Sequence, residues 1–320
     1  MPLSRRLLLA ALSLAPAAAR AQEWPARPLW LVVPFAPGGA SDLLARLLAE
    51  RLAPLLGQPV VVDNRPGAGA TVGANAVARA AADGYTLLYG TPGPQIVNPT
   101  LMPSLPYDAE KDFSPVVSLI RAPNILVVHP SVPARSVAEL IALAKAQPGR
   151  LSFGSSGIGA SSHLAGEMLK HMAGIDITHV PFRGSGPALQ ELLAGNISMT
   201  LDTLTLVLGH VGNGALRPLA VTTPQRAAVM PDLPALAETL PGFNASALNY
   251  LTAPAGTPPA IIARLNGLVN GLLQDTAFRQ RLVEQGFEPT GGTPEALAQQ
   301  ITAEAAQWRQ VIRAANIRVE

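Results

Sequence analysis

The feature that most constrains this chain is a repeated alternation of short apolar runs with helix-like segments. Residues 29–34, 59–64 and 85–90 read LWLVVP, PVVVDN and YTLLYG. Between the first two runs, in residues 41–57, leucines recur at spacings of three and four, which places them on one face of a helix. Because nearly continuous apolar strands are typical of parallel sheets covered on both faces, this pattern predicts a parallel α/β unit.

A second unit follows residues 91–124, a stretch rich in proline and turn signals that we interpret as a connection without strands. Apolar runs begin again at residue 125 and alternate with helical segments to residue 223, and residues 224–245 are loop-like again. Ser136 has the spacing of a capping box, and Thr293 with Pro294 predicts the start of a C-terminal helix.

Two similar units and a helical C-terminal tail predict an α/β protein of two lobes joined by two crossover segments. We expect one lobe to contain residues 22–123 and 244–320 and the other to contain residues 124–243. Ligands of such sheets bind outside the carboxyl ends of the strands, so the loops after the strands are where a site is expected.

The first 21 residues, MPLSRRLLLAALSLAPAAARA, have the charged, apolar and small-residue regions of a signal peptide. A membrane anchor needs roughly 20 apolar residues, and Pro16 and Arg20 interrupt this run too early. We expect cleavage before Gln22 and a periplasmic location. Arg5 and Arg6 leave general and twin-arginine export as alternatives.

Composition excludes several classes of protein. With 48% hydrophobic and 14% charged residues, a chain of 320 residues is expected to form a real core. The absence of cysteine excludes disulfides, thiolate metal sites and a cysteine nucleophile. Three of the 23 basic residues lie in the leader, which leaves 20 basic against 21 acidic residues. This balance does not indicate a nucleic-acid surface.

Two strand-to-helix turns, residues 34–42 (PFAPGGASD) and 153–163 (FGSSGIGASSH), are the best candidates for a site. Both place glycine and other small residues before a helix, with Ser41 as the candidate N-cap of the first. Backbone N–H groups there lack intrahelical partners and the helix dipole favours an anion. Either turn could hold a carboxylate or phosphate, or the glycines could only permit tight turns.

Other motifs are weaker. Residues 65–73 resemble a dinucleotide fingerprint, but Val72 stands where the last glycine is needed. No G-x-S-x-G elbow occurs, and His163 is the one histidine expected near a ligand. Asp42 and Asp202 could be ligand contacts, caps or hinge contacts. Arg65 and Arg183 could meet a carboxylate or lie in solvated loops.

The same residues resemble the substrate-binding proteins of tripartite tricarboxylate transporters, also called Bug receptors or TctC-like proteins. The resemblance covers essentially the whole mature chain. It is carried by the ordered blocks WPARPLWLVVPFAPGGASD, GQPVVVDNRPGAGATVGANAVARAAADGYTLLYG, NPTLMPSLPYDAEKDFSPV, HPSVPARSVAELIALAKAQPG, HLAGEMLKHMAGIDITHVPFRGSGPALQELLAGNISMTLD, LRPLAVTT and APAGTPPAII.

The resemblance implies a type II-like periplasmic-binding-protein fold that closes on a small carboxylate. Binding would use backbone groups and ordered water in the two turns rather than a fixed arginine. Partners would be the membrane permease subunits and, for signalling, a sensor protein, with no cofactor, no metal and a monomeric state. By position, the implied ligand-binding residues are Phe35, Ala36, Gly38, Gly39, Ser41, Asp42, Thr91, Ser155, Gly157, Gly159, Ser161, Ser162, His163 and Asp202. Gln95 departs from the histidine that many members carry, so the ligand of a relative cannot be transferred.

Two functions therefore remain. The chain is either a solute receptor that delivers a carboxylate to a permease or a secreted serine hydrolase that uses His163. The missing nucleophile elbow and the lack of an identifiable triad favour the receptor.

Overall fold

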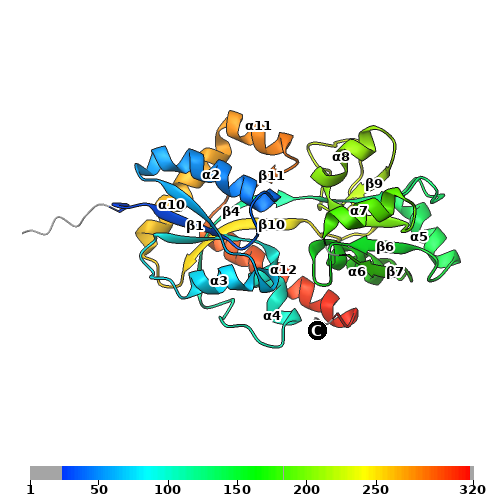
Figure 1. Cartoon of the computed structure of the whole chain (residues 1–320), viewed down its shortest axis with the longest axis horizontal. Coiled ribbons are helices and arrows are strands. Elements are labelled where there is room, and N and C mark those ends of the chain that lie inside the picture. The colour runs from blue at the N-terminus through cyan, green and yellow to red at the C-terminus, as the bar shows by residue number, and fades with distance from the viewer. Residues whose placement is uncertain (1–23, 183, 318–320) are drawn as a thin grey trace, which may run out of the picture.

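The computed structural model describes residues 24–182 and 184–317. The predicted leader, its cleavage point before Gln22 and the candidate residue Arg183 lie outside these residues. Two α/β lobes lie side by side along the long axis of the molecule (Figure 1). Among the described helices, none combines the length and apolar character needed to cross a bilayer.

The first lobe is built on a six-stranded sheet. Its strand order is β11-β4-β10-β3-β1-β2. The strands are β1 (Leu29–Val33), β2 (Val60–Asn64), β3 (Thr86–Gly90), β4 (Phe113–Ala122), β10 (Ala247–Pro254) and β11 (Glu288–Pro289). Strands β1, β2 and β3 are parallel as predicted, but β10 is antiparallel to β3 and β4, and β11 is antiparallel to β4.

The second lobe has a five-stranded sheet in the order β7-β6-β8-β5-β9. Its strands are β5 (Asn124–Val128), β6 (Ser152–Ser155), β7 (Thr178–Pro181), β8 (Met199–Thr203) and β9 (Arg217–Val221). Strand β6 is parallel to β7 and β8, whereas β5 is antiparallel to both of its neighbours. Both sheets are therefore mixed. The predicted parallel arrangement is confirmed for β1, β2 and β3, but it is wrong for the first sheet as a whole, which also contains the antiparallel strands β10 and β11.

The prediction that residues 91–124 contain no strand is also wrong, because β4 lies there. Its Pro115 is a turn signal in the sequence, but the pairing of β4 with β10 shifts register next to the Thr252–Pro115 pair. A bulge of this kind is where a strand tolerates proline. The same stretch also forms a turn of π-helix, η2 (Gly93–Val97), and the short α4 (Asn98–Leu101).

Helices cover the sheets and fix the positions of the loops that connect them to the strands. They are α2 (Ala40–Leu56), α3 (Thr71–Ala78) after a 3-10 turn (Ala68–Ala70), α5 (Val137–Ala146), α6 (Ser161–Ala173), α7 (Ser185–Leu193), α8 (Leu204–Gly212), α9 (Leu236–Thr239), α10 (Pro259–Gln274), α11 (Thr276–Glu284) and α12 (Pro294–Ala314). Ser136 and Thr293 cap α5 and α12 as predicted, accepting hydrogen bonds from Glu139 and Ala296 backbone N–H groups. The predicted N-cap Ser41 is wrong, because Gly39 occupies that position.

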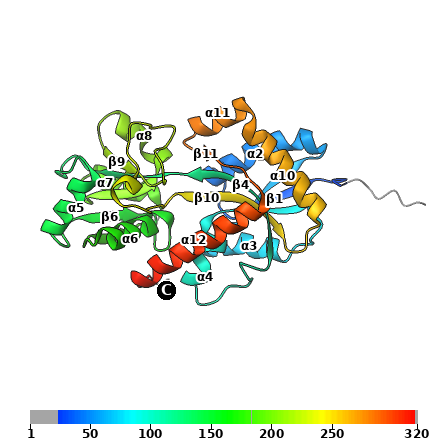
Figure 2. The same cartoon turned by 180° about the vertical axis from the view of Figure 1, so that it is seen from behind.

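The described chain crosses from one sheet to the other twice. Strand β4 continues into β5 through Pro123, and residues 222–246 return from β9 to β10. Helix α12 runs from the first sheet across to the second lobe (Figure 2). Its Trp308 and Ile312 belong to the same apolar cluster as Phe153 and Leu169 of the second lobe.

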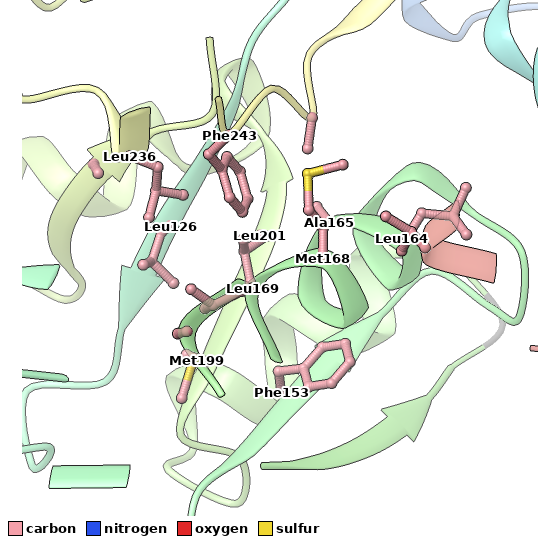
Figure 3. Packing of buried hydrophobic residues seen from close by; sticks show 14 of the residues in the cluster. Leu126, Phe153, Leu164, Ala165, Met168, Leu169, Met199, Leu201, Leu236 and Phe243 are labelled. Atoms are coloured by element: carbon pink, nitrogen blue, oxygen red, sulfur yellow. The ribbon is translucent and has the colours of Figure 1, made fainter. Parts of the chain in front are cut away.

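The interior of the second lobe is formed by side chains from α6 and from the strands that it covers (Figure 3). Phe153, Leu169 and Leu201 have no exposed surface. Because this core fixes α6 against its sheet, the N-terminus of α6 has a defined position at the side of the lobe that faces the first lobe.

Candidate functional site

A cavity of about 590 Å³ lies where the two lobes meet. This volume is within the range of small-molecule sites, roughly 300–1,000 Å³. Its wall includes residues of both predicted turns, namely Phe35, Ala40 and Ser41 from the first and Gly159, Ala160 and Ser161 from the second. The structure thus brings the two strand-to-helix turns to one cavity.

The first turn is shaped by Asp42. The Gly38 N–H donates to Asp42 Oδ2 over 2.9 Å, and Arg46 Nε donates to the same oxygen over 3.0 Å. Asn64 Nδ2 donates to Asp42 Oδ1 and also to the Phe35 carbonyl, over 3.0 and 3.1 Å. The Arg46 hydrogen bond is the main cause that lowers the pKa of Asp42 to about 2. Asp42 is therefore ionised, buried and turned into the loop.

The second turn is shaped by uncharged groups. Ser162 Oγ accepts from the Ser156 N–H over 2.9 Å, and His163 Nδ1 accepts from the Gly159 N–H over 3.0 Å. The His163 ring stacks on His179 with centroids 4.0 Å apart. His179 Nε2 in turn lies 2.6 Å from Ser155 Oγ.

Both histidines are neutral at physiological pH. Burial, as the main cause, lowers the pKa of His163 and of His179 to about 4. For His163 the neighbouring His179 and Lys170 contribute in the same direction. An Nδ1 that accepts a hydrogen bond must be unprotonated, so the geometry and the low pKa agree.

Each turn leads into a helix whose first N–H groups are available to a ligand. The N-caps, Gly39 of α2 and Ala160 of α6, make no side-chain capping hydrogen bond. The next residues, Ala40 and Ser161, line the cavity. N–H groups at this position have no intrahelical partner, and the helix dipole favours a negative charge beside them. One such donor set comes from each lobe.

Five of the predicted site residues line the cavity: Phe35, Ser41, Thr91, Gly159 and Ser161. The Thr91 hydroxyl is buried and has no hydrogen-bond partner among the described residues. An unpartnered buried hydroxyl at a cavity wall is suited to bind a ligand, because leaving it unsatisfied is costly.

The other predicted residues do not line the cavity. They are Ala36, Gly38, Gly39, Asp42, Ser155, Gly157, Ser162, His163 and Asp202. Gly38 and Gly157 have positive φ values of 88° and 136°, which glycine adopts readily. Asp202 accepts from the Thr203 N–H over 2.7 Å, and burial raises its pKa. Most of these residues shape the two turns without forming part of the cavity wall.

Sequence reasoning missed several lining residues. The cluster at 65–73, examined as a dinucleotide fingerprint, forms a third turn against the cavity, where Ala68 and Ala70 adopt positive φ values of 47° and 74°. Its place between a strand and a helix was the available signal. Tyr89, Asn249 and Trp308 also line the cavity, and no local pattern marks them.

The described part of the cavity wall is uncharged. Among the described residues, no Asp, Glu, Lys, Arg or His side chain lines it. The ion pair behind the wall joins Arg121 Nη2 to Glu304 Oε1 over 2.7 Å, and Arg121 Nη1 also donates to Ser246 Oγ. Within the described residues there is also no group of three side chains suited to a metal ion.

The hydrolase arrangement is not formed. No hydrogen bond joins Ser161 to His163 within the described chain, and His163 Nδ1 accepts from the Gly159 N–H instead. Ser155 and His179 are in contact, but Ser155 has no exposed surface. A nucleophile without access to solvent or to the cavity cannot reach a substrate.

Comparison with known proteins supplies the family. The model of the tripartite tricarboxylate transporter family receptor matches residues 44–317. Protein BugT of Bordetella pertussis is 40% identical over 295 residues, covering 92% of this chain and 90% of that protein. A protein of Pseudomonas sp. strain P51, encoded between tcbD and tcbE, is 38% identical over 317 residues, 97% of this chain and 94% of that one.

Solved structures agree with the fold. R. palustris Rpa4515 with adipate has a TM-score of 0.81 at 41% identity, covering 92% of this chain and 99% of that one. MatC from Rhodopseudomonas palustris with bound malate has a TM-score of 0.75 at 35% identity, covering 90% and 100%. The periplasmic binding protein BugD has a TM-score of 0.76 at 33% identity, covering 93% and 100%.

Proposed function

Because this chain belongs to the tripartite tricarboxylate transporter receptor family, whose members are solute-binding receptors and not enzymes, we propose that it captures a small carboxylate between its lobes. The captured ligand is delivered in the periplasm to the membrane permease subunits of the transporter. For signalling, a sensor protein would recognise the same closed, ligand-bound form of the receptor.

The observation that carries the proposal is the pairing of two helix N-termini across one cavity. Ala40 begins α2 in the first lobe and Ser161 begins α6 in the second, and both line the cavity. A carboxylate has two oxygens and can accept from both sets of N–H groups only when the lobes are close. Binding therefore favours closure, a hinge motion for which the crossings at Pro123 and residues 222–246 provide the pivots.

The structural neighbours support a carboxylate as the ligand class. Rpa4515 was solved with adipate and MatC with malate. The predicted leader supports export, since the receptor has to meet its ligand outside the inner membrane. N-terminal sequencing of secreted protein should begin at or near Gln22, and a retained Met1 would contradict cleavage.

The test is a calorimetric titration of the mature chain with mono-, di- and aromatic carboxylates. Each acid is compared with its primary amide, which has a similar shape and no charge. We expect at least one acid to bind while its amide does not, and small-angle scattering to show a smaller radius of gyration in the bound state. Absence of binding to every acid would contradict the proposal, and ester turnover lost in Ser161→Ala would restore the hydrolase.

A further inference from the structure

Two polar residues of the cavity wall are neighbours on adjacent strands of the first lobe. Strands β3 and β10 are antiparallel, and Gly90 lies opposite Tyr250. Thr91 follows Gly90 and Asn249 precedes Tyr250, so the two residues occupy the next step of the same ladder. Residues opposite each other in such a pair have Cβ atoms about 4.5–5.5 Å apart on one face of the sheet. Both Thr91 and Asn249 line the cavity.

The Asn249 side chain has a defined orientation and one free donor. Its Nδ2 donates to the Ala247 carbonyl over 3.0 Å, and its Oδ1 accepts from the Tyr89 hydroxyl over 2.8 Å. Because a carbonyl cannot donate, the amide nitrogen must be the atom that faces Ala247. The second Nδ2 hydrogen has no acceptor among the described residues, although only 5% of Asn249 is exposed. A ligand oxygen that supplies this acceptor would therefore gain affinity.

The surroundings hold this pair of residues in place. Burial raises the pKa of the Tyr89 hydroxyl, and the Ser41 side chain beside it acts in the opposite direction. The Tyr250 hydroxyl donates to the Thr91 carbonyl over 3.0 Å. The pairing of β10 with β4 also shifts register between Asn249 and Tyr250, and bulges of this kind re-aim side chains next to sites. The pair is thus built on strands and connects through Tyr89 to Ser41, at the start of α2.

Asn98 shows what distinguishes Asn249. Asn98 also lines the cavity, but its Nδ2 donates to the Gly69 carbonyl over 2.9 Å and to Thr71 Oγ1 over 3.3 Å, which uses both hydrogens. The free Asn249 hydrogen is instead next to the unpartnered Thr91 hydroxyl, which can donate or accept. Together they suit a hydroxyl, which accepts from Asn249 and donates to Thr91, or a carboxylate oxygen, which accepts from both.

From this arrangement we infer that Asn249 and Thr91 form a second polar subsite. The ligand carries an oxygen group for it, a hydroxyl or a second carboxylate, besides the carboxylate held at the helix N-termini. This inference rests on the proposed function and narrows its ligand class. An unsubstituted alkyl acid would place methylene groups against both donors and leave them without acceptors, and sites built to hydrogen-bond a substrate reject such analogues.

The test is a calorimetric titration of the wild-type mature chain with acids of matched length. Butyrate is compared with 2-hydroxybutyrate, 4-hydroxybutyrate and succinate, and hexanoate with 6-hydroxyhexanoate and adipate. We expect at least one oxygenated acid to bind about tenfold or more tightly than the unsubstituted acid of its length. A hydroxy acid that binds most tightly identifies a hydroxyl at the subsite and a diacid identifies a carboxylate, and either result supports the inference.

Two other outcomes would contradict it in different ways. If butyrate and hexanoate bind as tightly as all of their oxygenated partners, the inference is overturned while the carboxylate receptor stands. Failure of every acid, together with the rest of the carboxylate panel, would overturn both the inference and the proposed function.

Substitutions test the location of the subsite. Asn249→Leu removes the donor at similar volume, and we expect the preference for the best oxygenated acid over its unsubstituted partner to fall about fivefold or more. Asn266→Leu is the matched control, because Asn266 Nδ2 donates to the Val116 and Gly292 carbonyls, both over 2.8 Å, outside the cavity. This control should destabilise the fold and leave the preference unchanged. Thr91→Val should lower the same preference even if Asn249→Leu does not fold, and an unchanged preference in the folded variants would overturn the inference.

Discussion

The two turns of the cavity have the same backbone design and opposite electrostatics. In the first, Gly38 donates its N–H to the third residue of α2, Asp42. In the second, Gly159 donates its N–H to the third residue of α6, His163. Both glycines have left-handed φ values, 88° and 79°. The acceptor is an ionised carboxylate in one lobe and a neutral imidazole in the other.

This difference shows what the turn requires. The third helical residue must present an acceptor that holds the preceding glycine in its tight conformation, and the charge of that acceptor is secondary. Where the acceptor is anionic, Arg46 binds the same oxygen, which offsets repulsion of a bound carboxylate. Where it is neutral, Ser162 and the stacked His179 complete the turn. The two lobes should therefore contribute comparably to binding and respond differently to acid.

The largest effect is expected from proline at the first residue of each helix. Ala40→Pro and Ser161→Pro each remove one N–H donor at a helical position that tolerates proline. The preceding residues, Gly39 and Ala160, already have extended ψ values of 174° and 159°. Because hydrogen bonds to charged groups contribute about 1.5–3 kcal/mol, each variant should weaken binding roughly 10- to 150-fold in calorimetry.

The matched control is Thr276→Pro, at the first residue of α11, which follows Asp275 with a ψ of 121°. Thr276 is exposed and does not line the cavity. The Thr276→Pro variant should leave the affinity for the carboxylate unchanged. A loss in only one of the two cavity variants would show that one lobe alone binds the anion.

Acid should act on the second turn first. The pKa values of His163 and His179 are lowered to about 4 in the folded protein, below the unfolded value of roughly 6.5. Their contribution to the free energy of unfolding is therefore fully present above about pH 6.5 and is lost as the pH falls towards 4. Asp42, with a pKa of about 2, stays ionised in that range.

Amide hydrogen exchange reports this difference residue by residue. Between pH 6.5 and 4 the protection factor of Gly159 should fall by about tenfold, because protonated Nδ1 of His163 no longer accepts its N–H. The protection factor of Gly38 should stay nearly constant. Glu167 and Lys170 also lie near His163. Because burial, and not Lys170, is the main cause of the low pKa of His163, the Gly159 response should persist in Lys170→Gln. A parallel fall at both glycines would indicate global loosening instead.

A smaller effect is expected at Thr91. Replacing its unpartnered hydroxyl by valine should weaken ligand binding about fivefold and leave the unliganded protein at least as stable. Thr200→Val is the contrasting variant, since the Thr200 hydroxyl donates to the Gly154 carbonyl over 3.0 Å away from the cavity. That variant should lower the thermal midpoint without changing affinity. Equal destabilisation in both would mean that Thr91 is structural.

The parts of this molecule that sequence reasoning could predict are those fixed by local rules. Ser136 and Thr293 cap helices through spacing alone, and the two turns follow from small residues between a strand and a helix. Strand β4 and the antiparallel pairing of β10 depend on contacts between distant segments. Trp308 lines the cavity from the C-terminal helix, and its position there also depends on contacts between segments distant in the sequence.

Local sequence patterns also could not predict the direction in which a polar side chain points. Asp42 and His163 lie in the predicted turns, yet both point back to the backbone of their own loop. A sequence pattern identifies an acceptor near a helix N-terminus, but the neighbours that decide its orientation, Arg46 and His179, become evident only in the folded chain.

The most direct test of the central claim is an amide NMR titration of the wild-type protein with its tightest carboxylate and, separately, with the matching primary amide. If neutral donors of both lobes bind the anion, the Ala40 and Ser161 N–H resonances should move downfield together with one dissociation constant, and the primary amide should leave both nearly unchanged. Shifts confined to one turn, or equal shifts with the acid and the amide, would contradict the claim that the two helix N-termini jointly hold the carboxylate.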